Sequence, residues 1–365
     1  MTLPTNKVKR QVELDFIRGL AILLVLHFHY TKSVFFFHIT AVPVLNFGWA
    51  GVDLFFVLSG FLVGGLLCKE WSKSGHVEVG RFLKRRGFKI WPAYYFYILV
   101  EVIIHKHPLN TFLWQNLLNI QNYTGTSLAQ TWSLAVEEHF YILLSVVIWW
   151  CASRKVSVRT FFYGSMLLAV SVATFRTFLA FSGKHYLTET HTRIDALLLG
   201  VMLALLFHFS RERFLALQSR TLPLALILTA ALVVLLFVHA ESHNGMQIIA
   251  ADLGSGALFL LLYKPGLVQH GRLYRLVAAI GVYSYGIYLW HVGMTAPVQR
   301  VLAHVPKAAP YLQYPVAAVL AILVGVLMTK LIEFPFLRLR ERFVPTVIKY
   351  ELPAETEPNP PVLTH

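Results

Sequence analysis

Residues 14–29 read Leu14-Asp-Phe-Ile-Arg18-Gly-Leu-Ala-Ile-Leu-Leu-Val-Leu-His27-Phe-His29. The stretch is apolar except for a few ionisable side chains, and we extend it to residue 37. A helix needs about 20 mostly apolar residues to cross the hydrocarbon core of a bilayer. The sequence therefore predicts that the chain enters a membrane here, with arginine and histidine inside the spanning helix.

The composition extends this prediction to the whole chain. Of the 365 residues, 56% are hydrophobic and only 14% are charged, whereas soluble proteins carry about 25% charged residues. A water-soluble enzyme is thereby excluded. Ten runs in all, including 14–37, predict an all-α, polytopic membrane protein; the others lie at 50–68, 88–104, 131–151, 160–182, 194–209, 222–239, 247–263, 276–296 and 315–334.

The basic residues are distributed unevenly between alternate connections. Of the 32 Lys and Arg, 23 fall in the set that holds the N-terminus, the 69–89 loop and the residues after the last span, and five fall in the other set. Cytoplasmic loops carry the excess of Lys and Arg. Both termini are therefore predicted to be cytoplasmic, in an integral multi-pass protein of a bacterial cytoplasmic membrane. The same bias explains the net charge of +14 without nucleic acid as a partner.

Outside the spans the sequence offers few landmarks. It contains no GxxxxGK[ST] loop, no GxGxxG turn and no CxxC pair. The HExxH motif and His/Cys clusters at metal-ligand spacing are also missing from the sequence, so no metal site is predicted. We divide the chain into a transmembrane domain, 1–345, and a proline-rich cytoplasmic tail, 346–365, which is predicted to be disordered.

Arg18 and His29 share one face of the first predicted helix. Eleven helical residues bring them to nearly the same side, about 16 Å apart along the axis. His27 is turned by about 160° from His29, so we assign it a structural role. An ionisable side chain inside a spanning helix costs about 2.5–3.5 kcal/mol, which makes Arg18 and His29 candidate functional residues. The alternative is that Arg18 reaches lipid phosphates and His29 bonds a neighbouring carbonyl.

Polar residues from four other spans are expected at a depth similar to that of His29. They are Asp53, Glu137, the pair Arg193 and Asp195, and His291. A carboxylate that orients an imidazole in a water-poor site suits proton abstraction from a hydroxyl. The sequence therefore predicts a catalytic cluster in the outer half of the membrane.

A simpler interpretation of these outer residues stays open. Arg193 and Asp195 would pair with each other, and Glu138 would face the outer water.

The loop before the third span is strongly basic and aromatic. It includes Arg85, Arg86 and Lys89 and is followed by Trp91 and two tyrosines. One interpretation is a cytoplasmic anion site for a phosphorylated donor, extended by Arg18. The other is the usual excess of positive charge beside an interfacial aromatic belt.

These motifs resemble the acyltransferase-3 family of integral membrane O-acyltransferases. The matches occur in the family's order along nearly the whole chain. They are Arg18-x10-His29, Gly51-Val-Asp53-Leu-Phe-Phe-Val-Leu-Ser-Gly-Phe61, Arg85 with Lys89-Ile-x-Pro92, Trp132-Ser-Leu-x-Val-Glu137-x-x-Phe-Tyr141, Arg193-x-Asp195-x-Leu-Leu-x-Gly200, Ser284-Tyr-x-x-Tyr-Leu-Trp-His291 and Glu333-x-Pro335-Phe336.

The resemblance implies transfer of an acyl group, commonly acetyl, from cytoplasmic acyl-CoA to a hydroxyl. The acceptor is expected to be an envelope polysaccharide, a lipid-linked glycan or a small glycoside. The resemblance makes His29 the central catalytic residue, with Arg18 near the donor and Glu137 as a further site residue. Together with the charges described above, we predict as catalytic residues His29, Glu137 and Asp53, as CoA-binding residues Arg18, Arg85, Arg86 and Lys89, and as acceptor-binding residues Trp132, Arg193, Asp195 and His291. Lys89 stands where arginine is usual, which keeps the charge but loses the bidentate fork.

Two other classes of function compete with this interpretation. A secondary transporter or flippase for an anionic or glycosylated solute would use the same buried charges as a proton relay. The sequence shows neither an inverted repeat nor paired broken helices that would favour a transporter. A non-enzymatic assembly subunit is a weaker alternative, since it would need no polar path through the bilayer. The sequence does not indicate an oligomeric state.

Overall fold

The computed structural model describes residues 11–31, 47–105, 109–184, 187–237, 240–264, 271–304 and 309–345. Within these ranges all regular structure is helical and no strand is present, which confirms the all-α prediction. The α-helices are α1 Val12–Thr31, α2 Gly51–Ser74, α3 Val79–His105, α4 Leu109–Leu117, α5 Gln121–Thr124, α6 Trp132–Ser153, α7 Val158–Phe181, α8 Ile194–Phe209, α9 Arg211–Ser219, α10 Thr221–Phe237, α11 Ala240–Leu262, α12 Arg272–Val282, α13 Ser284–Trp290, α14 Thr295–Leu302, α15 Ala309–Met328 and α16 Phe334–Phe343.

Each of the ten apolar runs forms helix within the described residues, although not all are long enough to span. Six helical segments are long and apolar enough to cross a membrane, and α8 with α9, bent by 119°, makes a seventh if it counts as one span. The chain is an integral membrane protein of several apolar helices. The count of ten and the cytoplasmic position of both termini stay predictions. Part of the first run, 32–37, and the tail 346–365 lie outside the described residues.

The run 276–296 is not one continuous helix. It is divided into α12, α13, the 3-10 turn Val292–Met294 and α14, and Tyr283 has non-helical dihedrals of φ −101° and ψ 9° at the first break. The 69–89 segment also differs from the prediction of a loop. α2 continues to Ser74 and α3 begins at Val79, so the basic side chains are held on helices.

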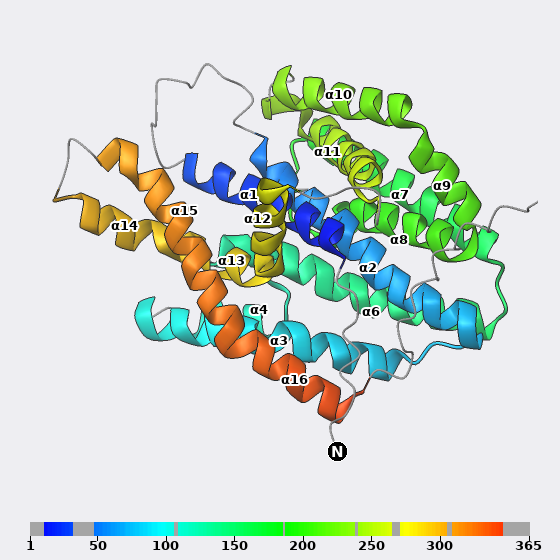
Figure 1. Cartoon of the computed structure of the whole chain (residues 1–365), viewed down its shortest axis with the longest axis horizontal. Coiled ribbons are helices and arrows are strands. Elements are labelled where there is room, and N and C mark those ends of the chain that lie inside the picture. The colour runs from blue at the N-terminus through cyan, green and yellow to red at the C-terminus, as the bar shows by residue number, and fades with distance from the viewer. Residues whose placement is uncertain are drawn as a thin grey trace, which may run out of the picture.

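The last span is longer than predicted and ends on the basic face of α3. α15, the π-helical turn Thr329–Glu333 and α16 form the long diagonal that crosses Figure 1. α16 packs against α3, and Arg85 on α3 pairs with Glu341 on α16 at 2.7 Å. α16 thereby places Arg340 in the lining of the cavity described below.

Close helix crossings are built on glycine. At the contact between α2 and α8, a Cβ on Gly60 would lie 2.0 Å from the carbonyl oxygen of Leu197. A Cβ on Gly200 would lie 2.2 Å from the carbonyl oxygen of Val57. Small residues let helix backbones approach closely in a membrane, where packing replaces the hydrophobic effect as the main source of association.

We expect Gly60→Ala to lower the unfolding temperature, because the added methyl group overlaps a backbone atom that has no freedom to move away. Overpacking of this kind costs about 1–3 kcal/mol. Gly80→Ala is the matched control, since a Cβ there meets nothing within 4 Å. Tryptophan fluorescence during heating in detergent measures both variants, and equal unfolding temperatures would contradict the steric argument.

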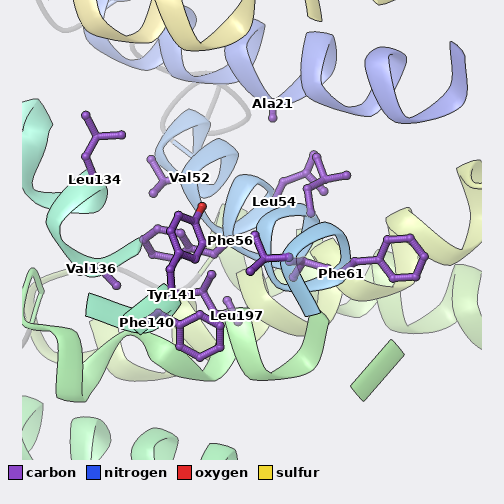
Figure 2. Close-up of a cluster of buried hydrophobic side chains, with 14 of the residues drawn as sticks. Ala21, Val52, Leu54, Phe56, Phe61, Leu134, Val136, Phe140, Tyr141 and Leu197 are labelled. Carbon is purple, nitrogen blue, oxygen red and sulfur yellow. The ribbon is translucent and has the colours of Figure 1, made fainter. Parts of the chain in front are cut away.

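The apolar core lies where α1, α2, α6 and α8 meet. Figure 2 shows part of it, including Ala21, Phe56, Leu134, Tyr141 and Leu197. Tyr141 is buried in this cluster at 2% exposure, although its hydroxyl is polar. The aromatic ring is thus fixed by apolar packing, and the position of its hydroxyl follows from that packing.

Candidate active site

A cavity of about 810 Å³ runs along α2, between this helix and α3, α6 and α13. Its lining residues on α2 extend from Val52 to Lys73, which is about 30 Å of helix. The cavity therefore connects two depths of the molecule.

One end of the cavity is strongly basic. The cations that line it come from α1, α2, α3, α9 and α16 and are Arg18, Lys69, Lys73, Arg81, Arg85, Arg86, Lys89, Arg211 and Arg340. Part of this charge is already balanced, since Arg81 pairs with Glu70 at 2.5 Å and Arg18 with Asp15 at 3.0 Å. The excess that remains suits a ligand with several negative charges, such as phosphate groups.

The middle of the cavity carries a short hydrogen-bonded chain. Tyr141 donates its hydroxyl to Oε2 of Glu137 at 2.8 Å, and Oγ of Ser59 lies 2.5 Å from the Tyr141 hydroxyl. All three residues line the cavity. The guanidinium of Arg86 lies 5.1 Å from the centroid of the Tyr141 ring. Glu137, predicted from sequence, therefore faces the same cavity as the predicted donor-binding cations.

The far end of the cavity leads to the two predicted histidines. Ser133 and Tyr288 line the cavity there and their hydroxyls are 2.6 Å apart. The Tyr288 ring lies 5.6 Å from that of His291, and the His291 ring lies 4.7 Å from that of His29. His29 and His291 thus meet across α1 and α13, one residue layer beyond the cavity lining.

The hydrogen bonds of both histidines define which nitrogen carries the hydrogen. Nδ1 of His29 is 3.0 Å from the carbonyl oxygen of Val25, and Nδ1 of His291 is 2.7 Å from that of Tyr288. A carbonyl only accepts, so each Nδ1 must donate and each Nε2 is the basic nitrogen. Nε2 of His291 is buried without a hydrogen-bond partner. His27 faces elsewhere, with Nδ1 3.2 Å from the Tyr314 hydroxyl.

Asp53 and Arg193 form a separate buried pair, with the half-buried Trp132 packed against it, and none of the three lines the cavity. Arg193 pairs with Asp53 at 2.5 Å and lies 5.3 Å from the Trp132 ring. Asp53, predicted to be catalytic, is fully buried by these contacts. Its carboxylate links α2 to the residue that precedes α8, and its catalytic role stays a prediction.

The simpler interpretation of the outer residues is wrong in two details. Asp195 pairs with Arg176 at 2.7 Å and not with Arg193. Glu138 is buried, where it accepts a hydrogen bond from Trp91 at 3.0 Å, and does not face open water. Arg176 also contacts Asp252 at 3.3 Å, so α7, α8 and α11 share a buried charge network.

The structure therefore brings the predicted residues together in three groups. Arg18, Arg85, Arg86, Lys89 and Glu137 line the cavity. His29 and His291 meet beyond the end lined by Tyr288. Asp53, Arg193 and Asp195 belong to buried ion pairs beside the cavity, and Trp132 packs on Arg193.

Sequence reasoning missed several residues of the cavity wall. Ser59, Tyr141 and Tyr288 stand within the motifs quoted above but were given no role. Their signal was a hydroxyl at cavity depth, which is weak because serine and tyrosine are common in apolar helices.

Comparison with known proteins agrees with this architecture. The acyltransferase domain of the acyltransferase-3 family matches residues 11–330. The chain therefore belongs to this family of membrane acyltransferases. No solved structure matches the chain.

Curated relatives are named O-acetyltransferases. The chain is 27% identical to the peptidoglycan O-acetyltransferase OatA of Listeria monocytogenes, over 79% of this chain and 50% of that protein. It is 26% identical to the O-acetyltransferase OatA of Staphylococcus aureus, over 83% and 55% of the two chains. A putative O-acetyltransferase of the same species matches at 25% identity, over 94% and 61%. The chain thus spans about half to three-fifths of the length of these relatives.

Proposed function

We propose that the chain transfers an acyl group from acyl-CoA to a hydroxyl of a carbohydrate-type acceptor, and that this acyl group is acetyl. The observation that carries this proposal is the cavity, which joins a cluster of cations to Glu137 and reaches Tyr288, whose ring contacts His291 next to His29. CoA presents several phosphate charges at one end and a thioester at the other, in the same order as the cations and the polar residues along the cavity. We place the protein in the cytoplasmic membrane of a bacterium, with the basic end of the cavity facing the cytoplasm.

Arg18, Arg85, Arg86 and Lys89 would hold the phosphates by charge-assisted hydrogen bonds. Arg85 is shared, because it also pairs with Glu341 and bonds the carbonyl oxygen of Val344. Within the described part of the chain Lys89 lies within ion-pair distance of no carboxylate, which leaves its ammonium as a direct contact for a ligand.

On the other side, Nε2 of His29 would take the proton of the acceptor hydroxyl, with His291 contacting the acceptor. A buried basic nitrogen without a donor, as found at His291, costs free energy that a bound hydroxyl would return. The name of the Listeria relative specifies peptidoglycan, and a glycan hydroxyl is the acceptor class that we propose for this chain. No metal is required by this scheme.

Binding of acetyl-CoA to the purified chain in detergent tests the donor side. We expect Arg18→Ala and Lys89→Met each to weaken binding by about 10-fold, because each removes a charged hydrogen-bond donor worth about 1.5–3 kcal/mol before compensation. Arg159→Ala is the control, since Arg159 is exposed on α7 and lines no part of the cavity. A folded protein that binds no acetyl-CoA would contradict the acyltransferase proposal and favour a transporter.

A further inference from the structure

The two hydrogen bonds that link Ser59, Tyr141 and Glu137 run in one direction, from the serine to the carboxylate. The Tyr141 hydroxyl has one hydrogen, which it donates to Glu137. In the contact between Ser59 and Tyr141, Ser59 must then be the donor. The carboxylate of Glu137 therefore acts on the serine oxygen through the phenol.

Ser59 does not bond its own helix as Ser74 and Ser153 do. These two serines donate to the carbonyl oxygen four residues earlier, which is the usual bond for serine in an apolar helix. Ser59 instead bonds across to α6, and its side chain is half-buried on the cavity wall. Its oxygen is thus both accessible to a ligand and connected to a base.

We propose that Ser59 is the nucleophile that accepts the acyl group from the donor. A hydroxyl becomes a nucleophile when an adjacent base takes its proton and a further group holds that base in place. Here Glu137 is the base, Tyr141 is the connecting group, and Arg86 lies 5.1 Å from the Tyr141 ring to stabilise negative charge that develops there. This inference rests on the proposed function, because it requires an acyl thioester in the cavity.

In the first half-reaction, Oγ of Ser59 attacks the thioester carbonyl carbon. A serine ester forms, the C–S bond breaks, and the thiolate leaves. The serine proton passes to Tyr141 while the phenol proton passes to Glu137, which then protonates the thiolate. In the second half, the acceptor hydroxyl attacks the carbonyl carbon of the serine ester while His29 takes its proton. The bond between that carbon and Oγ of Ser59 breaks, and the proton held by His29 returns to the serine oxygen. Donor and acceptor then need not occupy the cavity together.

The experiment mixes the purified full chain with radiolabelled acetyl-CoA and no acceptor, quenches in acid, and locates the label by peptide mass spectrometry. We expect an acetyl-sized mass increase on the peptide that contains Ser59. Ser59→Ala should abolish this label, and Tyr141→Phe should slow its appearance by about 10²–10⁴-fold, as expected for loss of general-base assistance.

Two further variants separate a chemical role from a structural one. Ser59→Cys keeps a nucleophile and should form a thioester that neutral hydroxylamine cleaves. Ser145→Ala is the matched control, because Ser145 is a buried serine on α6 that bonds its own helix at the carbonyl of Ile142. It should label as wild type does.

The outcomes also separate this inference from the proposed function. Wild-type protein that binds and turns over acetyl-CoA without any label on Ser59 would overturn the inference and leave the function standing. Label on His29 would do the same and make His29 the acyl carrier. Protein that binds no acetyl-CoA would contradict both.

Discussion

Replacing His29 with alanine is expected to lower the rate of acyl transfer to a sugar hydroxyl by about 10²–10⁴-fold, with acetyl-CoA binding unchanged. The carbonyl of Val25 fixes the hydrogen on Nδ1, so Nε2 is the basic nitrogen that we propose takes the acceptor proton. The His29 ring lies beyond the cavity lining beside His291, away from the cations proposed to hold the donor. If Ser59 carries the acyl group, labelled protein should accumulate in His29→Ala.

His27→Ala provides the matched control for this experiment. His27 is two residues away on the same helix, but its ring bonds Tyr314 on α15. We expect this variant to transfer acyl groups at close to the wild-type rate. Transfer rates in membrane vesicles with a soluble glycan acceptor compare the two. A rate for His29→Ala that matches His27→Ala would remove His29 from the reaction.

The sequence was sufficient to locate the helices because hydropathy is a local property. The predicted run 194–209 coincides with α8, and 160–182 differs from α7 by two residues at its start. The break at Tyr283 was not predictable in this way. Val282 and Ser284 are not helix-breaking residues, and tertiary contacts set the break: Gly281 on α12 and Gly286 on α13 each approach a different neighbouring backbone closely.

The depth of a side chain in the membrane was also easier to predict than the direction in which the side chain points. Residue numbering along a helix gives the level of a side chain, which placed Asp53 near His29. It does not give the neighbour toward which the side chain points, because that depends on how the helices pack. Asp53 points to Arg193 at the start of α8, whereas Glu137 lines the cavity. Equal depth therefore predicted one cluster where the structure has separate groups.

The partners of Arg176 were likewise not predictable from the sequence. From sequence it was an isolated cation in the fifth predicted span, with no partner at helical spacing. In the structure it is fully buried and joins Asp195 and Asp252, which are far from it along the chain. A buried charge in an apolar helix thus predicts that partners exist, but only the packing identifies them.

Arg176→Met is expected to destabilise the protein by about 3–5 kcal/mol, because it leaves buried carboxylates without a counter-charge. Arg176 donates to the carbonyl oxygen of Thr192 at 2.7 Å as well as to Asp195, so its loss also frees the turn that leads into α8. Arg159→Met on the same helix is the control, since Arg159 is exposed. The measurement is the unfolding temperature of each variant in detergent.

A double variant tests whether unpaired carboxylate charge causes this loss of stability. If unpaired carboxylate charge is the cause, adding Asp252→Asn to Arg176→Met should recover part of the lost stability, because it removes one negative charge from the network. A loss caused only by missing side-chain volume would be unchanged or greater in the double variant. Stability of Arg176→Met equal to that of Arg159→Met would show that the network contributes nothing. Arg193 directly precedes α8 and pairs with Asp53 on α2. We therefore expect a weakened network to misplace α8 against α2, which lowers acyl transfer and reduces the label on Ser59 in parallel.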